Sequence, residues 1–213
     1  VSYLVTAMLL GPFIQIWQPW IFAVQDAAER ARLVARVGTY AVLAVGVASL
    51  GVILFGRQAV MILGADRSFW EADGVIPFAA AGYVFWALYH VSQTPLYLDK
   101  KTGRLVLVNL VAVLANLALN FALIPRLGIQ GAAVATCLTF ALIAALGMLA
   151  SRRSAGVTFE HARLATILSM VVAGGALALW IDGLEAAGGM SLLAAVSLKA
   201  AAFTGLAAAS FFL

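Results

Sequence analysis

The chain has 213 residues, of which 64% are hydrophobic and only 10% are charged, with a formal net charge of +4 and a pI of about 9.6. A soluble domain carries roughly 25% charged residues, so this composition excludes a substantial water-soluble domain and indicates an integral membrane protein. The basic residues cluster at the ends of apolar runs, as expected where they set membrane orientation and contact lipid headgroups, and we expect no nucleic-acid partner.

In chain order, the apolar runs predict seven transmembrane helices, because one crossing needs about 20 apolar residues. We place these spans at 1–24, 34–56, 75–98, 104–124, 128–150, 163–182 and 190–213. Pro12 and Pro95 are expected to kink the first and third spans without ending them. The predicted fold class is an all-α integral membrane protein, with residues 1–213 forming a single transmembrane helical domain.

Lysine and arginine concentrate in alternate connections between these spans, and short cytoplasmic loops are enriched in both residues. The first, third and fifth connections are therefore expected in the cytoplasm, and they contain Arg30, Arg32, Arg36, Lys100, Lys101, Arg104, Arg152, Arg153 and Arg163. The other connections, expected outside, hold Arg57, Arg67 and Arg126 together with Asp66, Glu71, Asp73, Asp182 and Glu185. This pattern predicts an external N-terminus and a cytoplasmic C-terminus. Because the chain begins at Val1 and both ends lie in apolar runs, we expect a C-terminal fragment of a longer protein.

Polar side chains inside spans are costly unless they pair or face a hydrated cavity, so they are the candidates for substrate binding. In the third span, Trp86, His90, Gln93 and Tyr97 follow at intervals of four, three and four, which places them on one helix face. Aromatic faces with hydrogen-bonding edges would suit a sugar-bearing ligand. The alternative is that the aromatic residues lie at the membrane interface and His90 makes an interhelical hydrogen bond.

Two further sets of polar residues lie within spans. Asn109, Asn116 and Asn120 share a face of the fourth span, where either interhelical hydrogen bonding or contact with a substrate would explain them. Lys199 lies about ten residues into the seventh span and could snorkel or line a cavity. Its place in the last of seven helices is similar to that of the lysine in retinal proteins, but a Schiff base needs a carboxylate counter-ion. We expect no acid inside a span, and hence no cofactor.

No catalytic or metal site is expected. The two histidines, His90 and His161, are far apart in the chain, and the single cysteine, Cys137, lies within an apolar run. Neither a pair of carboxylates in a span nor a phosphate-binding loop is evident, so the sequence does not predict an enzyme.

Three consecutive stretches carry a family resemblance: Lys101-Thr-Gly-Arg-Leu-Val-Leu-Val-Asn109, Leu114-Ala-Asn-Leu-Ala-Leu-Asn-Phe-Ala-Leu-Ile-Pro125 and Gly128-Ile-Gln-Gly-Ala-Ala-Val-Ala-Thr136. They resemble the polysaccharide flippases of the multidrug/oligosaccharidyl-lipid/polysaccharide exporter superfamily. Physically, Pro125 is expected to end the fourth span, with Gly128 and Gly131 forming a tight outer turn. Small residues after that turn would let the fifth span approach a neighbouring helix closely.

The resemblance implies that the chain is the second lobe, with two extra C-terminal helices, of a transporter of 12–14 helices in a bacterial inner membrane. It implies translocation of undecaprenyl-pyrophosphate-linked oligosaccharide or polysaccharide units by alternating access, with a polysaccharide polymerase or glycosyltransferases as further partners. The candidate cavity-lining residues are Trp86, His90, Gln93, Tyr97, Asn116, Asn120 and Lys199. Two alternatives stay open: a cation-coupled multidrug antiporter of the same superfamily, and a structural membrane subunit of a polysaccharide assembly complex.

Overall fold

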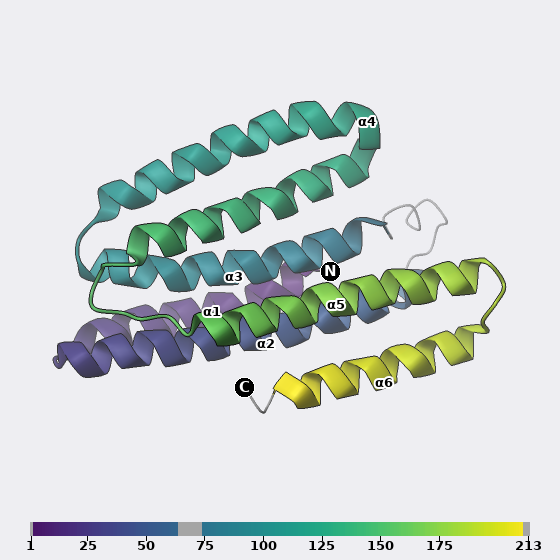
Figure 1. The fold of residues 1–213 in the computed structure, drawn as a ribbon, viewed down its shortest axis with the longest axis horizontal. Coiled ribbons are helices and arrows are strands. Elements are labelled where there is room, and N and C mark those ends of the chain that lie inside the picture. Colours follow the sequence, from purple (N-terminus) through teal and green to yellow (C-terminus); the bar gives the residue numbers. More distant parts are fainter. Residues whose placement is uncertain (1, 64–73, 211–213) are drawn as a thin grey trace.

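The computed structural model describes residues 2–63 and 74–210, within which the chain forms six α-helices. They are α1 (Ser2–Ala23), α2 (Ala27–Leu63), α3 (Ile76–Leu98), α4 (Thr102–Ser151), α5 (His161–Ala186) and α6 (Leu192–Ser210). The helices lie side by side along the long dimension of the molecule (Figure 1). The predicted all-α class is confirmed, whereas the predicted count of seven helices is wrong.

Four helical segments are long and apolar enough to cross a membrane: Ala27–Val60, Thr102–Ser151, His161–Glu185 and Leu192–Ser210. By helix length and hydropathy, the chain is therefore a multi-pass membrane protein. Helix α3 is not among the four, because His90, Gln93 and other polar side chains lower its hydropathy. Pro12 lies inside α1 and Pro95 inside α3, so neither ends its helix, as predicted.

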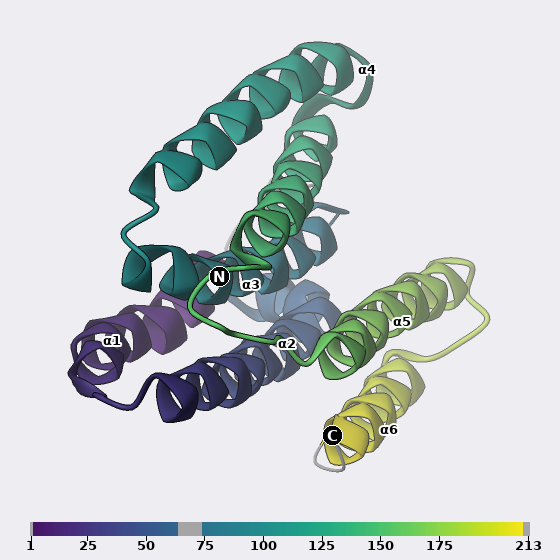
Figure 2. The same ribbon diagram turned by 60° about the vertical axis from the view of Figure 1, so that its left-hand side comes forward.

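Helix α4 covers both the fourth and the fifth predicted spans. Its first arm (102–127) and second arm (129–151) run in opposite directions and reverse at Gly128, which has φ 56° and ψ −134° (Figures 1 and 2). The two arms are separate helical stretches that meet at Gly128 as the one non-helical residue within α4, so they correspond to the fourth and fifth predicted spans and to the turn predicted at Gly128. Pro125 lies inside α4, so the prediction that it ends the fourth span is wrong. A Cβ atom on Gly131 would lie 2.5 Å from the Leu123 carbonyl oxygen, which explains the need for glycine beside the reversal.

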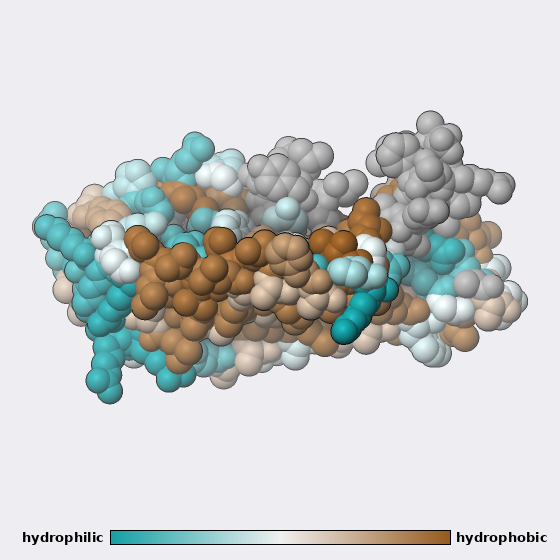
Figure 3. All heavy atoms as spheres, turned by 90° about the horizontal axis from the view of Figure 1, so that it is seen from above, coloured by the Kyte–Doolittle hydropathy of each residue, from teal (hydrophilic) through white to brown (hydrophobic). Residues whose placement is uncertain are grey.

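Helix α3 lies at the centre of the bundle and packs against α1, α2, α4 and α5. Its Val84, Ala87 and Tyr89 are almost fully buried within a core shared by these helices. By contrast, the first arm of α4 exposes large apolar side chains such as Val106 and Phe121, as expected of a surface that faces lipid tails. Apolar atoms cover much of the middle of the face seen in Figure 3, with hydrophilic residues at its left end and others toward the right.

The three connections richest in lysine and arginine all lie at one end of the bundle, on the left in Figure 1. They are the connection from α1 to α2, the connection from α3 to α4, and residues 152–160 between α4 and α5. We call this the basic end. The reversal at Gly128 and the connection between α5 and α6 lie at the opposite end. The expected acidic residues Asp66, Glu71 and Asp73 lie outside the described residues.

Candidate functional site

Four polar or aromatic residues of α3, which we call the α3 row, form two contacting pairs: Trp86 with His90, and Gln93 with Tyr97. The ring centroids of Trp86 and His90 are 4.8 Å apart, and the planes are at 89°, an edge-to-face contact. The Tyr97 hydroxyl donates a hydrogen bond of 3.1 Å to Gln93 Oε1. The helical spacing thus brings together the residues that the sequence placed on one face.

The α3 row lies between α1 and the second arm of α4. Trp86 contacts Phe140 of the second arm, with ring centroids 4.9 Å apart. On the other side, His90 lines a hollow of about 10 Å³ together with Trp17 and Gln18 of α1. That volume admits about one water molecule. A sugar could therefore reach His90 only after α1 and α3 had moved apart.

The polar atoms of the α3 row do not hold helices together. Among the residues that the structure describes, Trp86 and His90 make ring contacts without hydrogen bonds, and the hydrogen bond of Gln93 and Tyr97 stays within α3. The sequence alone left open that His90 makes an interhelical hydrogen bond. Within the described residues, His90 makes no such bond. In this conformation these polar groups thus make no hydrogen bond to another described helix, and Gln93 is buried.

Asn109 and Asn116 of α4, by contrast, bond to other helical segments, whereas Asn120 bonds within its own arm. Asn109 Nδ2 donates to the Tyr89 hydroxyl of α3 at 2.6 Å, and Asn116 Nδ2 donates to Thr139 Oγ1 of the second arm at 3.0 Å. Asn120 donates to the backbone and side-chain oxygens of Asn116, both at 2.9 Å. Of the two explanations left open, the geometry supports interhelical hydrogen bonding for Asn109 and Asn116.

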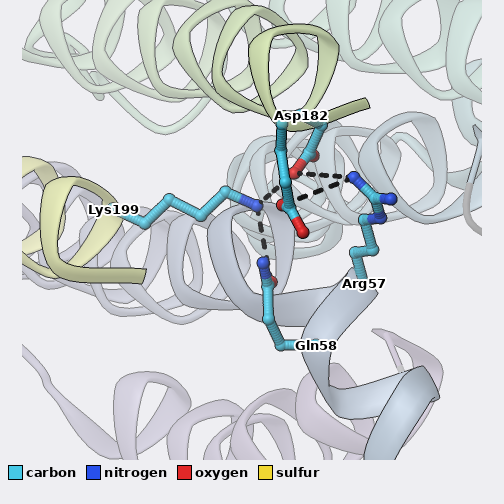
Figure 4. Close-up of polar contacts among 5 residues, drawn as sticks. Arg57, Gln58, Asp182 and Lys199 are labelled. Carbon is cyan, nitrogen blue, oxygen red and sulfur yellow. Dashed lines mark hydrogen bonds and ion pairs between the residues drawn. The ribbon is translucent and has the colours of Figure 1, made fainter. Parts of the chain in front are cut away.

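A cluster of charged and polar residues joins α2, α5 and α6 (Figure 4), near the connection between α5 and α6. Lys199 Nζ lies 2.6 Å from Asp182 Oδ1 and 3.4 Å from Gln58 Oε1. Arg57 Nη1 lies 3.6 Å from both Asp182 Oδ1 and Glu185 Oε2. We call these five residues the Lys199 cluster. It contains two cations and two carboxylates, so their formal charges balance.

Burial is unequal within the Lys199 cluster. The Lys199 side chain is 0% exposed, whereas the Asp182 side chain is 23% exposed. Lys199 therefore does not snorkel to the surface, and its ammonium depends on nearby acceptors because an unpaired buried charge is strongly unfavourable. The expectation that no acid lies within a span near Lys199 is wrong, since Asp182 belongs to α5.

Asp182, Glu185, Arg57 and Gln58 are the site residues that the sequence analysis did not select. Their positions at span ends led us to assign the three charged ones to connections, but α2 continues to Leu63 and α5 to Ala186. One signal was available. Asp182 lies six residues before Gly188-Gly189-Met190 and Lys199 nine residues after it, so an antiparallel hairpin of α5 and α6 brings the two residues near each other.

At the basic end, Asp99 follows directly after α3. Its carboxylate accepts a hydrogen bond of 2.6 Å from Lys101 Nζ, and this bond is the main reason that the pKa of Asp99 lies below its ordinary value. Lys101 also reaches Ser154 Oγ at 3.4 Å, in the connection between α4 and α5. The Asp99–Lys101 pair therefore ties two connections of the basic end together.

The fold and these contacts define a class, a multi-pass α-helical membrane protein with a polar aromatic row and an interhelical ion-pair cluster. No family model matches the chain, and no curated protein or solved structure matches it. Within the described residues, no group of three His, Cys, Asp or Glu side chains is placed to hold a metal ion.

Proposed function

We propose that this chain is the second lobe of a flippase that moves lipid-linked oligosaccharide or polysaccharide units across a bacterial inner membrane by alternating access. The observation that carries the proposal is the α3 row, whose polar edges are not used for contacts between described helices. Stacking aromatic rings beside amide and imidazole groups can hold a sugar. The sequence resemblance at 101–136 supports the same function.

The proposed mechanism uses the small size of the hollow beside His90. In the conformation described, the hollow between α1 and α3 is too small for a sugar. Transport therefore requires a second conformation in which the α3 row opens to one side of the membrane, and the cost of opening is offset by contacts with the substrate. In the proposed orientation, the basic end faces the cytoplasm, since short cytoplasmic loops are rich in lysine and arginine.

The test is export in a flippase-deficient bacterial strain that expresses the full-length protein. The double variant His90→Leu with Gln93→Leu keeps the helix apolar, so we expect normal membrane abundance and at least a tenfold loss of export per molecule. Asn116→Leu is the matched control, because it also removes a polar group inside the bundle but breaks the bond to Thr139. That control should lower abundance and leave export per molecule intact.

Two results would count against the proposal. Full export by the His90 and Gln93 double variant would remove the α3 row from the substrate path. Loss of abundance in that variant, with unchanged export per molecule, would assign the row to packing instead.

A cation-coupled antiporter is the second candidate, and one observation favours it. Asp182 places a carboxylate between α2, α5 and α6, where a proton or cation could compete with Lys199. If the chain is an antiporter, Asp182→Asn should abolish proton-driven drug efflux while the variant protein stays folded. If it is a flippase, sugar export should instead depend on the α3 row.

A further inference from the structure

The basic end carries most of the positive charge of the protein. It contains nine of the thirteen Lys and Arg residues but only four of the nine acids, an excess of five positive charges. Most of these cations have intramolecular partners: Lys101 pairs with Asp99, Arg163 pairs with Glu160, and Arg104 donates to the Ala150 carbonyl. Arg36 belongs to the remaining group, together with Lys100, Arg152 and Arg153, whose side chains make no hydrogen bond or ion pair within the described part of the chain.

Arg36 and Arg32 line a hollow of about 450 Å³ between the start of α2 and the connection that precedes α5. The two arginines are four residues apart, so their guanidinium groups share one helix face. Gly156, Thr158 and Glu160 form the opposite wall. The hydrogen bond from Arg32 Nε to the Ala28 carbonyl leaves its terminal nitrogens free to bind an anion. Asp26 and Glu29 lie in a second hollow that shares these arginines.

The position of this hollow along the membrane normal follows from helix geometry. Arg36 and Arg57 are both on α2 and are 21 residues apart, which corresponds to about 30 Å along a helix. That distance matches the thickness of the hydrocarbon core of a bilayer. If α2 crosses with Arg57 at one boundary, Arg36 lies at the other, at the depth of lipid phosphates.

We propose that the hollow between Arg32, Arg36 and residues 156–160 binds the phosphate of an anionic phospholipid headgroup. Guanidinium groups bind phosphate oxygens through paired, charge-assisted hydrogen bonds. The alanines of α2 that line the hollow, including Ala28 and Ala35, leave room for the glycerol portion of the headgroup. Glu160, although paired with Arg163, opposes the anion and limits its affinity. This site does not depend on the transported substrate, so it stands apart from the proposed flippase function.

Binding can be measured on the purified protein in a neutral detergent by native mass spectrometry, with short-chain phosphatidylglycerol as the probe. Short-chain phosphatidylcholine and inorganic phosphate are parallel probes that separate an anionic lipid site from a general lipid site and from a free-anion site. We expect phosphatidylglycerol to bind more tightly than either. Replacing one arginine by glutamine should weaken the binding of phosphatidylglycerol roughly fivefold. The double variant Arg32→Gln with Arg36→Gln should weaken it about 25-fold.

The matched control is Arg152→Gln with Arg153→Gln, which removes the same charge from exposed residues at the same end that do not line the hollow. Its affinity for phosphatidylglycerol should change less than twofold. Arg32→Lys with Arg36→Lys keeps the charge and loses the paired geometry, so it should fall between wild type and the glutamine variant. Glu160→Gln should bind more tightly than wild type.

Three outcomes would overturn the site. Equal weakening in the Arg152 and Arg153 control would show that only net charge matters. Equal affinity for phosphatidylcholine, whose phosphate is neutralised by its choline cation, would show that the site does not select a headgroup with net negative charge. Inorganic phosphate binding as tightly as phosphatidylglycerol would show a free-anion site and not a lipid site.

Discussion

Lys199 Nζ of α6 lies 2.6 Å from Asp182 Oδ1 of α5, and the lysine side chain is completely buried while the aspartate is partly exposed. The pair links the last two helices, and Gln58 and Arg57 extend it to α2. On α6, only Ala195, Lys199 and Ser210 are buried, while Phe203 packs against Phe55 of α2. The ion pair therefore adds a buried polar contact to a largely exposed helix whose other contacts with α2 and α5 include apolar ones.

The unequal burial predicts an unequal response to removing each partner. Asp182→Asn leaves a buried ammonium without its main counter-charge and should destabilise the fold by about 3 kcal/mol. Lys199→Met leaves a partly exposed carboxylate that still has Arg57 nearby, and should cost about 1–2 kcal/mol. Equilibrium unfolding in mixed micelles measures both. Lys100→Met, at an exposed lysine, is the control, and a larger loss for Lys199→Met than for Asp182→Asn would contradict the prediction.

The α4 reversal predicts a local requirement for glycine. Gly131→Ala places a Cβ against the Leu123 carbonyl and should lower stability by about 2 kcal/mol through overpacking. Gly103→Ala is the matched control in the same helix, since no atom lies within 4 Å of its added Cβ, and its effect should stay within about 0.5 kcal/mol. Thermal unfolding of the purified variants compares them, and equal melting temperatures would mean that the two arms are not this close.

The lowered pKa of Asp99 predicts an acid-sensitive contribution to stability. The folded state favours ionised Asp99 because of Lys101, so this contribution is present above the unfolded carboxyl pKa and is lost as the pH falls through the lower, folded pKa. Asp99→Asn should therefore melt below wild type at neutral pH, and the difference should shrink as the pH falls from the unfolded carboxyl pKa through the lowered, folded pKa. Melting curves of both proteins from neutral to acidic pH test this prediction. A difference in melting temperature that grows in acid would show the opposite sign of linkage.

The distribution of basic residues predicts the orientation of the protein. In a Cys137→Ser background, Lys100→Cys at the basic end should be protected from an impermeant thiol reagent added to intact cells. Ala187→Cys, in the connection between α5 and α6, should react. Both positions are exposed in the structure, so burial does not explain a difference. Labelling of the residue at position 100 from outside would reverse the orientation.

The sequence by itself determined the membrane class, the helical fold and the placing of the α3 row on one face. These follow from apolar content, helix periodicity and the cost of polar groups in lipid, all of which are local or compositional. The wrong predictions concerned the ends of helices. Pro125 indicated a break that the structure places at Gly128, and Asp182 was assigned to a connection although α5 continues past it.

Only the tertiary structure decided which polar groups have partners. Asn116 and His90 are both polar residues inside the bundle, yet Asn116 bonds to Thr139 whereas His90 has no hydrogen bond within the described residues. Likewise, Lys199 and Asp182 are 17 residues apart in sequence and pair because two helices pack in antiparallel fashion. Such contacts depend on the rotation and register of one helix against another, which hydropathy and spacing along a single helix do not specify.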